Sequence, residues 1–387
     1  MGTRTNADRS ASEDHSGVMW KTLHHAVLSG VARSVAPAAV FLALLGAFAP
    51  SACAQEPEGP LSPIVPLRGA LERITVHGAS LEGNLEGDNP DRPVTVYLPP
   101  GYASSPGRRY PVLYMLHGFT DSDLNWMGWR EHFVNVPAAM ERALDAGTVQ
   151  EMIIVMPNAY TAYAGSMYSS SVTTGDWETF VAEEVVAYVD ANYRTIPERG
   201  SRGLAGHSMG GYGTMRIGMK RPDVFGSIYA MSACCMPASL DPEPERFEQL
   251  VAIRTMDEVD AASFGAKIAF ASSAAWSPNP NAPPFYLDFP VADGAVQPDV
   301  VARQAANSIF AMIDQYVPEL RALDAIALDC GEQDFLVDGT RELSRILDSY
   351  GIEHTAEIYD PGNHVSHVDG QVELRVLPFF SRQLRFP

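Results

Sequence analysis

Apolar and polar positions follow a regular pattern from residue 71 to the C-terminus. The segments 71–77 and 93–98 are predicted to be strands, and the first of them alternates apolar and polar side chains. Continuous apolar runs at 110–116 and 152–156 are typical of strands that are buried on both faces of a mainly parallel sheet. Further strands are predicted for the residues just before Ser208 and for 226–232, 325–330 and 355–359.

Helical segments separate these strands. Apolar side chains share one face of a helix in 176–192, and Asp176 is expected to cap its N-terminus. Helices are also predicted over 136–146, directly after Ser208 and over 340–350. This alternation of strands and helices predicts an α/β fold with a mainly parallel, doubly wound sheet.

The segment 237–318 interrupts the alternation. It is rich in Pro, Ala, Asp and Asn, and its prolines cluster at 278–290. We interpret it as an insertion over the carboxyl edge of the sheet. Such an insertion is either a lid or binding loop or an excursion without a role, and the sequence leaves both interpretations open.

The first 54 residues have the pattern of a targeting segment. A weakly basic stretch at 21–33 precedes an apolar run at 35–50, and Ala52-Cys53-Ala54 supplies a cleavage site. The apolar run is short for a membrane span, so no stable membrane span is expected. Cys53 could instead carry a lipid, but Pro50 disfavours that alternative. Cleavage near Ala54 would deliver a secreted or periplasmic protein.

The chain after this segment is expected to contain one domain. Residues 55–70 are Pro-rich and are interpreted as a linker, which leaves 71–387 for a single catalytic domain. A hydrophobic content of 46% supports a substantial core, and a formal net charge of −20 argues against a nucleic-acid surface. The sequence does not indicate an oligomeric state.

Three cysteines remain after the expected cleavage site, at 234, 235 and 330. Either Cys330 pairs with one of the adjacent two, or all three are buried thiols. The sequence contains no C-x-x-C or H-E-x-x-H motif, so no metal site is expected.

Ser208 lies in the G-x-S-x-G pattern Gly206-His207-Ser208-Met209-Gly210, between a predicted strand and a predicted helix. A serine at the apex of such a turn needs a strained backbone, and the two glycines leave room for the chain arms to approach each other. The pattern is the nucleophile elbow of α/β-hydrolases, in which the serine attacks an ester carbonyl.

A serine hydroxyl becomes a nucleophile when a histidine, oriented by a carboxylate, removes its proton. In this fold the order along the chain is Ser, acid, His. Asp334 and His364 each follow a predicted strand and match that order, so they are the expected acid and base. His367 is the rival base. Two nearby acids are less suitable, because Asp329 is expected inside a strand and Asp338 as a helix N-cap.

The oxyanion of the reaction intermediate requires two backbone N–H groups. Those of Met209, after the nucleophile, and Phe119, after the strand at 110–116, are the candidates. Trp126 and Tyr168 are the expected substrate-binding side chains, since both follow buried strands on loops near the site. Both could equally be core aromatic residues.

Several of these segments resemble the esterase D family, which includes S-formylglutathione hydrolases, feruloyl esterases and mycolyltransferases. The segments that carry the resemblance are 116–118, 125–126, 176–178, 193–195, 206–211, 222–225, 331–334 and 362–364. The resemblance implies an α/β-hydrolase fold without a metal or organic cofactor. It also implies the same triad, Ser208, Asp334 and His364, and the same oxyanion residues, Phe119 and Met209.

The expected function is therefore that of an exported serine carboxylesterase acting on feruloyl, acetyl or other aryl esters, as small molecules or linked to carbohydrate. Two alternatives remain open: an acyltransferase with a carbohydrate acceptor, and a non-catalytic binding protein of the same fold. The intact order of serine, acid and histidine argues against the second alternative.

Overall fold

The computed structural model describes residues 65–237, 247 and 249–387. They belong to one compact unit, which spans 57–387. The expected targeting segment at 1–54 and the linker up to residue 64 lie outside the described residues. Within the described ranges, every helix is too short or too polar to cross a membrane.

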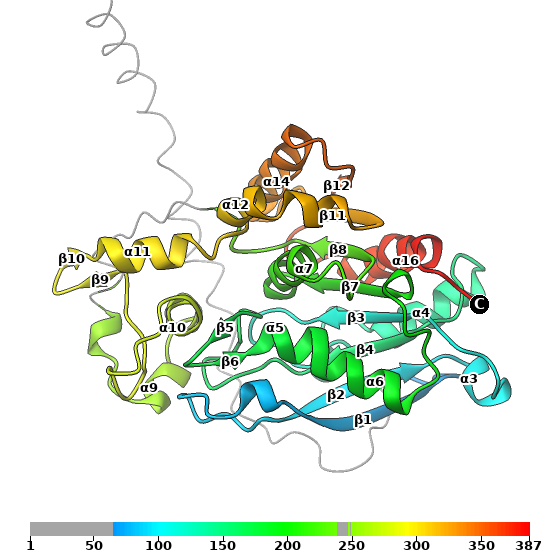
Figure 1. Cartoon of the computed structure of the whole chain (residues 1–387), viewed down its shortest axis with the longest axis horizontal. Coiled ribbons are helices and arrows are strands. Elements are labelled where there is room, and N and C mark those ends of the chain that lie inside the picture. Colours follow the sequence, from blue (N-terminus) through cyan, green and yellow to red (C-terminus); the bar gives the residue numbers. More distant parts are fainter. Residues whose placement is uncertain (1–64, 238–246, 248) are drawn as a thin grey trace, which may run out of the picture. The chain divides into compact units, whose positions relative to one another are not determined.

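In the described part of the chain, eight strands form one sheet in the order β1-β2-β4-β3-β7-β8-β11-β12 (Figure 1). β1 and β2 pair antiparallel, as do β2 and β4, whereas all pairs from β4 to β12 are parallel. The mainly parallel sheet is thus confirmed. The strands are β1 Ala70–His77, β2 Asp91–Leu98, β3 Val112–Leu116, β4 Ile153–Pro157, β7 Arg202–His207, β8 Ser227–Met231, β11 Ala325–Gly331 and β12 Thr355–Tyr359.

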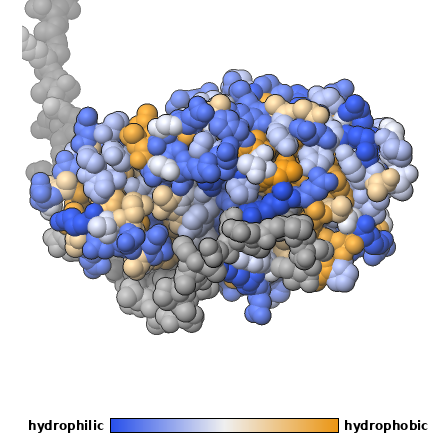
Figure 2. Space-filling model, turned by 90° about the horizontal axis from the view of Figure 1, so that it is seen from below, coloured by the Kyte–Doolittle hydropathy of each residue, from blue (hydrophilic) through white to orange (hydrophobic). Residues whose placement is uncertain are grey.

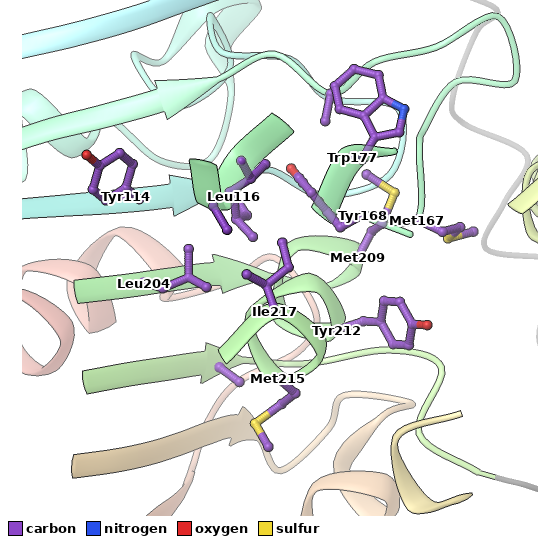
Figure 3. Close-up of a cluster of buried hydrophobic side chains, with 14 of the residues drawn as sticks. Tyr114, Leu116, Met167, Tyr168, Trp177, Leu204, Met209, Tyr212, Met215 and Ile217 are labelled. Carbon is purple, nitrogen blue, oxygen red and sulfur yellow. The ribbon is translucent and has the colours of Figure 1, made fainter. Parts of the chain in front are cut away.

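Helices cover both faces of the sheet, because successive strand side chains point to opposite sides and both sides are apolar. One core lies under α7 and the helix that begins at α5; Figure 3 shows Leu116 of β3, Leu204 of β7 and Ile217 of α7 meeting there. The second core lies under α4 and α16. These helices are α4 Val136–Asp145, α5 Trp177–Thr179 continued by α6 Val186–Asn192, α7 Met209–Lys220, α14 Val337–Ser349 and α16 Leu377–Gln383.

The ends of two helices test the sequence-based boundaries. Asp176 caps α5 as predicted, because its side chain accepts a hydrogen bond from the backbone of Thr179 at 3.1 Å. The predicted cap of α14 is wrong. The helix begins at Val337, so Asp338 lies in its first turn, and Asp334 accepts the hydrogen bond from the backbone N–H of Leu336 instead.

The predicted insertion lies between β8 and β11, at the carboxyl ends of the parallel strands (Figure 1). Its aromatic residues extend the core on the α7 side of the sheet, and Phe270 contacts Phe285 and Phe289 there with ring centroids 5.0 Å apart. Its described elements are α9 Met256–Asp260, α10 Phe264–Trp276, β9 Val291–Ala292, β10 Ala295–Val296, α11 Pro298–Ala305, α12 Ile309–Met312 and α13 Val317–Arg321.

Buried polar contacts hold this insertion to the helix that follows the nucleophile. The guanidinium of Arg216, in α7, donates to Glu178 at 2.7 Å and to the side chain of Asn307 at 2.9 Å. The hydroxyl of Tyr212, also in α7, donates to the backbone carbonyl of Asn307 at 2.7 Å. Because a buried guanidinium is costly without partners, these contacts argue that the insertion is an integral part of the domain.

The surface of the domain is largely polar. Figure 2 shows one face, on which hydrophilic side chains predominate and hydrophobic ones gather in scattered groups. This agrees with the strongly negative net charge of the chain.

An unusual carboxyl group lies between β1 and β2. Both side-chain oxygens of Glu86 are buried, and the side chains of Asp88 and Thr161 are their polar neighbours. Burial, with the charge of Asp88 adding to it, raises the pKa of Glu86 well above its ordinary value. The folded chain therefore holds this proton more tightly than the unfolded chain does.

The substitution Glu86→Gln is expected to stabilise the protein at alkaline pH relative to acidic pH. The contribution of a carboxyl group with a raised pKa is complete below its unfolded pKa of about 4.3, and it is lost as pH rises through the folded pKa, by at most about 1.4 kcal/mol per pH unit. Glutamine cannot ionise and avoids this loss. Urea denaturation at about pH 5 and about pH 8 measures the free energy of unfolding. The exposed Glu353 offers a control as Glu353→Gln, and an equal pH slope for Glu86→Gln and the parent would contradict the expectation.

Candidate active site

Ser208 occupies a strained turn between β7 and α7, with φ 58° and ψ −114°. The two flanking glycines are required by close backbone contacts. A Cβ added at Gly206 would lie 2.8 Å from the carbonyl oxygen of Leu116. One added at Gly210 would lie 2.5 Å from the carbonyl carbon of Leu116 and closer still to its oxygen. The turn therefore packs directly against the end of β3, which holds the serine at the carboxyl edge of the sheet.

The structure brings the three predicted triad residues together from three separate loops. The Oγ of Ser208 lies 3.0 Å from Nε2 of His364, and Nδ1 of His364 lies 2.9 Å from Oδ2 of Asp334. An ionised carboxylate only accepts hydrogen bonds, so Nδ1 carries the proton and Nε2 is free to accept the serine proton. The arrangement can relay a proton away from Ser208.

The environment of Asp334 favours its ionised form. Burial alone would raise the pKa of this carboxyl, but the hydrogen bond and charge of His364, together with the backbone N–H of Leu336, lower it below its ordinary value. Oδ1 accepts from Leu336 at 3.0 Å, while Oδ2 faces the imidazole. Both oxygens are thus held in place by separate donors.

The loops that carry the acid and the base are joined by Gln333. Its backbone N–H donates to the carbonyl of Gly362 at 2.8 Å, and its side-chain oxygen accepts from the N–H of Gly362 at 2.6 Å. Its side-chain nitrogen donates to Asp360 at 2.7 Å. The two loops also approach closely, since a Cβ on Gly331 would lie 3.0 Å from the Cα of Gly362. Asp334 and His364 are therefore positioned by one continuous hydrogen-bonded assembly, which sequence reasoning missed.

His207 forms a hydrogen bond with the backbone of the candidate base, His364. It is buried, and its Nε2 donates to the backbone carbonyl of His364 at 2.8 Å. Burial and the neighbouring imidazole of His364 lower the pKa of His207 to about 3, so the ring stays neutral. The two rings lie 4.8 Å apart. His207 thus fixes the backbone at His364 by this hydrogen bond.

The other candidate proton carriers lie elsewhere. His367 is exposed and forms the N-terminal boundary of α15 Val368–Gln371. His117 is buried; its Nε2 accepts from the backbone of Ala159 at 2.8 Å, so its Nδ1 donates to the carbonyl of Gly118 at 2.8 Å. It therefore connects the loops that follow β3 and β4. Asp329 lies inside β11, where it accepts from the hydroxyl of Tyr229.

The candidate oxyanion residues flank Ser208. Met209 is the first residue of α7, and its backbone N–H has no carbonyl partner within the helix because first-turn N–H groups lack one. A Cβ on Gly118 would lie 3.7 Å from the Cβ of Ser208, which places the backbone just before Phe119 beside the nucleophile. The side chains of Phe119 and Met209 converge, since a Cβ on Gly165 would lie 2.7 Å from both. The positions suit two N–H donors, and their role stays a prediction.

The expectation that Trp126 and Tyr168 line the substrate pocket is not met by this structure. Trp126 is 2% exposed and packs in the core under α4. Tyr168 is fully buried, and its hydroxyl donates to the carbonyl of His117 at 3.2 Å. Two other aromatic side chains are exposed at the site: Phe264, whose ring contacts that of Phe119, and Phe335, whose ring contacts that of His364. No motif in the sequence marks either of them.

The three described cysteines are free thiols. Cys330 is buried beside the hydroxyl of Ser232, at 3.6 Å, and the backbone N–H of Cys234 donates to the carbonyl of Ser208 at 3.2 Å. The disulfide alternative is therefore absent from this structure. In the described ranges, no three His, Cys, Asp or Glu side chains lie together as a metal site would require.

Comparisons with known proteins agree with this geometry. An esterase of Mycobacterium tuberculosis is 37% identical over 149 residues, which are 38% of this chain and 29% of that protein. The S-formylglutathione hydrolase of Rattus norvegicus is 26% identical over 161 residues, which are 37% of this chain and 51% of that enzyme. The matches thus span less than a third of the mycobacterial protein and about half of the rat enzyme.

The fold and the family are shown by two further matches. The solved structure of a ferulic acid esterase superposes with a TM-score of 0.57 and 25% identity, over 82% of this chain and 100% of that one. The family model Esterase, described as "Putative esterase", matches residues 88–334, a segment that contains Ser208 and ends at Asp334. Since that match covers more than half of the chain and the sheet has the expected architecture, the chain belongs to this esterase family of α/β-hydrolases.

Proposed function

We propose that the protein is a serine carboxylesterase that forms an acyl-enzyme on Ser208. The observation that carries the proposal is the continuous hydrogen-bonded path from Ser208 through His364 to Asp334, at 3.0 and 2.9 Å. A buried, ionised acid, a correctly oriented imidazole and a partly exposed elbow serine are the parts that acyl transfer needs. Family membership supports the same chemistry.

The reaction follows from the positions of these groups. His364 takes the proton of Ser208 as its Oγ attacks the ester carbonyl, and Asp334 stabilises the resulting imidazolium. The carbonyl oxygen becomes an oxyanion, which the N–H groups of Phe119 and Met209 stabilise. His364 then returns the proton to the alcohol oxygen, and the alcohol leaves. Water, activated by the same imidazole, hydrolyses the acyl-enzyme and restores the serine.

A fluorophosphonate probe tests the nucleophile. It is expected to label the native protein, with one adduct found on the peptide that contains Ser208, and to leave the Ser208→Ala variant unlabelled. The substitution Ser104→Ala, at an exposed serine far from the triad in sequence, is the matched control and should label normally. A folded native protein that does not label would favour a non-catalytic binding protein of this fold.

The substrate class is part of the proposal. The similarity to a ferulic acid esterase supports an aryl or feruloyl ester, and acetyl esters of carbohydrates are a related choice. The expected export of the chain weighs against a cytosolic glutathione thioester. A panel of p-nitrophenyl esters of increasing acyl length, together with methyl ferulate, ranks these classes by kcat/KM. Added sugar acceptors in the same assay separate hydrolysis from acyl transfer by the products formed.

Export itself is proposed from the sequence of residues 1–54 alone. N-terminal sequencing of protein from the secreting host is expected to begin near Gln55. A mature protein that begins at a lipid-modified Cys53 would instead make the chain a lipoprotein.

A further inference from the structure

The ring of Phe335 stands on the solvent side of the candidate catalytic base. Phe335 directly follows Asp334 on the loop that leads into α14, and it is 59% exposed. Its ring centroid lies 4.8 Å from that of His364, with an angle of 45° between the ring planes. Val365, next to the base in sequence, is 41% exposed. An exposed apolar surface therefore adjoins the imidazole.

The other aromatic ring that contacts this imidazole, that of His207, is buried. The ring of His207 lies 4.8 Å from that of His364 and belongs to the interior of the domain. The imidazole of His364 keeps 23% of its side-chain surface accessible. Of the two rings that contact this imidazole, that of Phe335 is exposed and that of His207 is buried.

The proton transfer from His364 determines which half of the ester, acyl or alcohol, lies beside its imidazole. Nε2 of His364 must pass the proton to the alcohol oxygen, so that oxygen has to come within hydrogen-bond reach, about 3 Å, of Nε2. The carbonyl oxygen instead turns toward the N–H groups of Phe119, on the loop after β3, and of Met209, at the start of α7. The alcohol group of the ester thus comes to lie beside the His364 ring, within van der Waals reach of Phe335.

We propose that Phe335 is a specificity-determining residue that receives the alcohol half of the ester, and that it selects alcohols with a flat apolar face, namely an aryl ring or the face of a sugar ring. Aromatic side chains bind such faces by offset stacking or edge-to-face contact, in addition to the apolar area that is buried. The inference rests on the proposed function, because it requires that His364 donate the proton to the leaving alcohol.

A purely structural role is the competing explanation. Phe335 could simply keep water away from the hydrogen bond between His364 and Asp334. In that case its removal would weaken the reaction of every ester by the same factor and would shift the pH profile of kcat/KM. A specificity role instead depends on the alcohol and leaves the pH profile in place.

The test keeps the acyl group constant and varies the alcohol. Values of kcat/KM are measured for ethyl acetate, phenyl acetate and an O-acetylated xyloside with the native protein, Phe335→Ala and Phe335→Tyr. For Phe335→Ala we expect a loss of about 5- to 10-fold with one or both ring alcohols and a change of less than about 2-fold with ethyl acetate. A loss confined to phenyl acetate identifies an aryl alcohol, and one confined to the xyloside identifies a sugar. Phe335→Tyr, which keeps the ring, should restore the native ratios.

Controls separate failure of this inference from failure of the proposed function. Tyr350→Ala removes a partly exposed aromatic side chain at the far end of α14 and should change none of the three values. An equal loss for all three esters, or no loss for any, would overturn the role of Phe335 while the requirement for Ser208 stands. Undiminished hydrolysis by Ser208→Ala would overturn the proposed function instead.

Discussion

The substitutions Asp334→Asn and His364→Ala are each expected to lower kcat by about 10³-fold or more. Without the imidazole, no group is placed at 3.0 Å from Ser208 to accept its proton. Without the carboxylate, Nδ1 of His364 loses the partner that fixes its tautomer and orientation. Steady-state kinetics on a p-nitrophenyl ester measure both effects. KM should change far less than kcat, because neither group is expected to bind the ester in its ground state.

His367→Ala is the matched control for this experiment. His367 is an imidazole on the same loop, three residues from His364, but it is exposed at the start of α15. Its removal should leave kcat near the native value. If His367→Ala were inactive and His364→Ala remained active, the assignment of the base would be wrong.

The substitution Gly210→Ala is expected to destabilise the fold by about 3 kcal/mol or more, or to prevent folding. The added Cβ would lie 2.5 Å from the carbonyl carbon of Leu116 and 2.9 Å from the carbonyl oxygen of His117. Both are backbone atoms of a buried central strand and its exit, so neither can rotate away as a side chain could. Urea or thermal denaturation measures the free energy of unfolding.

Gly265→Ala is the corresponding control. Gly265 is exposed in the first turn of α10, and an added Cβ would have no atom within 4 Å among the described residues. Alanine has the higher helix propensity, so this variant should equal the parent or gain up to about 1 kcal/mol of stability. A Gly210→Ala protein as stable as Gly265→Ala would show that the elbow does not need its close packing against β3.

Much of the fold could be predicted because the central strands are nearly continuous apolar runs. β3 and β4 are buried along their whole length, and the continuous apolar runs in their sequences indicate this burial. The spatial order of the strands was not predictable in the same way. That β3 lies between β4 and β7 depends on pairings between distant segments, and no local pattern records them.

The triad residues could be proposed from chain order and from their places after strands, because the carboxyl ends of parallel strands meet at one edge of the sheet. Side-chain exposure was harder to predict. Trp126 and Tyr168 follow strands as active-site residues do, yet the packing of surrounding loops encloses both. Phe335 looks like a core residue by composition, but the loop between Asp334 and α14 turns its ring outward. Whether such a side chain is exposed depends on contacts between distant segments, and the local sequence does not show these contacts.

The buried guanidinium of Arg216 has a consequence for engineering this scaffold. The residue belongs to the helix that begins at the nucleophile, while its partner Asn307 belongs to the segment between β8 and β11. A chimera that exchanges this segment for that of another esterase would keep the ion pair with Glu178, but it would remove one acceptor of the buried guanidinium unless the donor segment supplies an acceptor at the same place. Such grafts should therefore be designed with Arg216 and its acceptor as one transferable pair, or with an apolar residue at position 216.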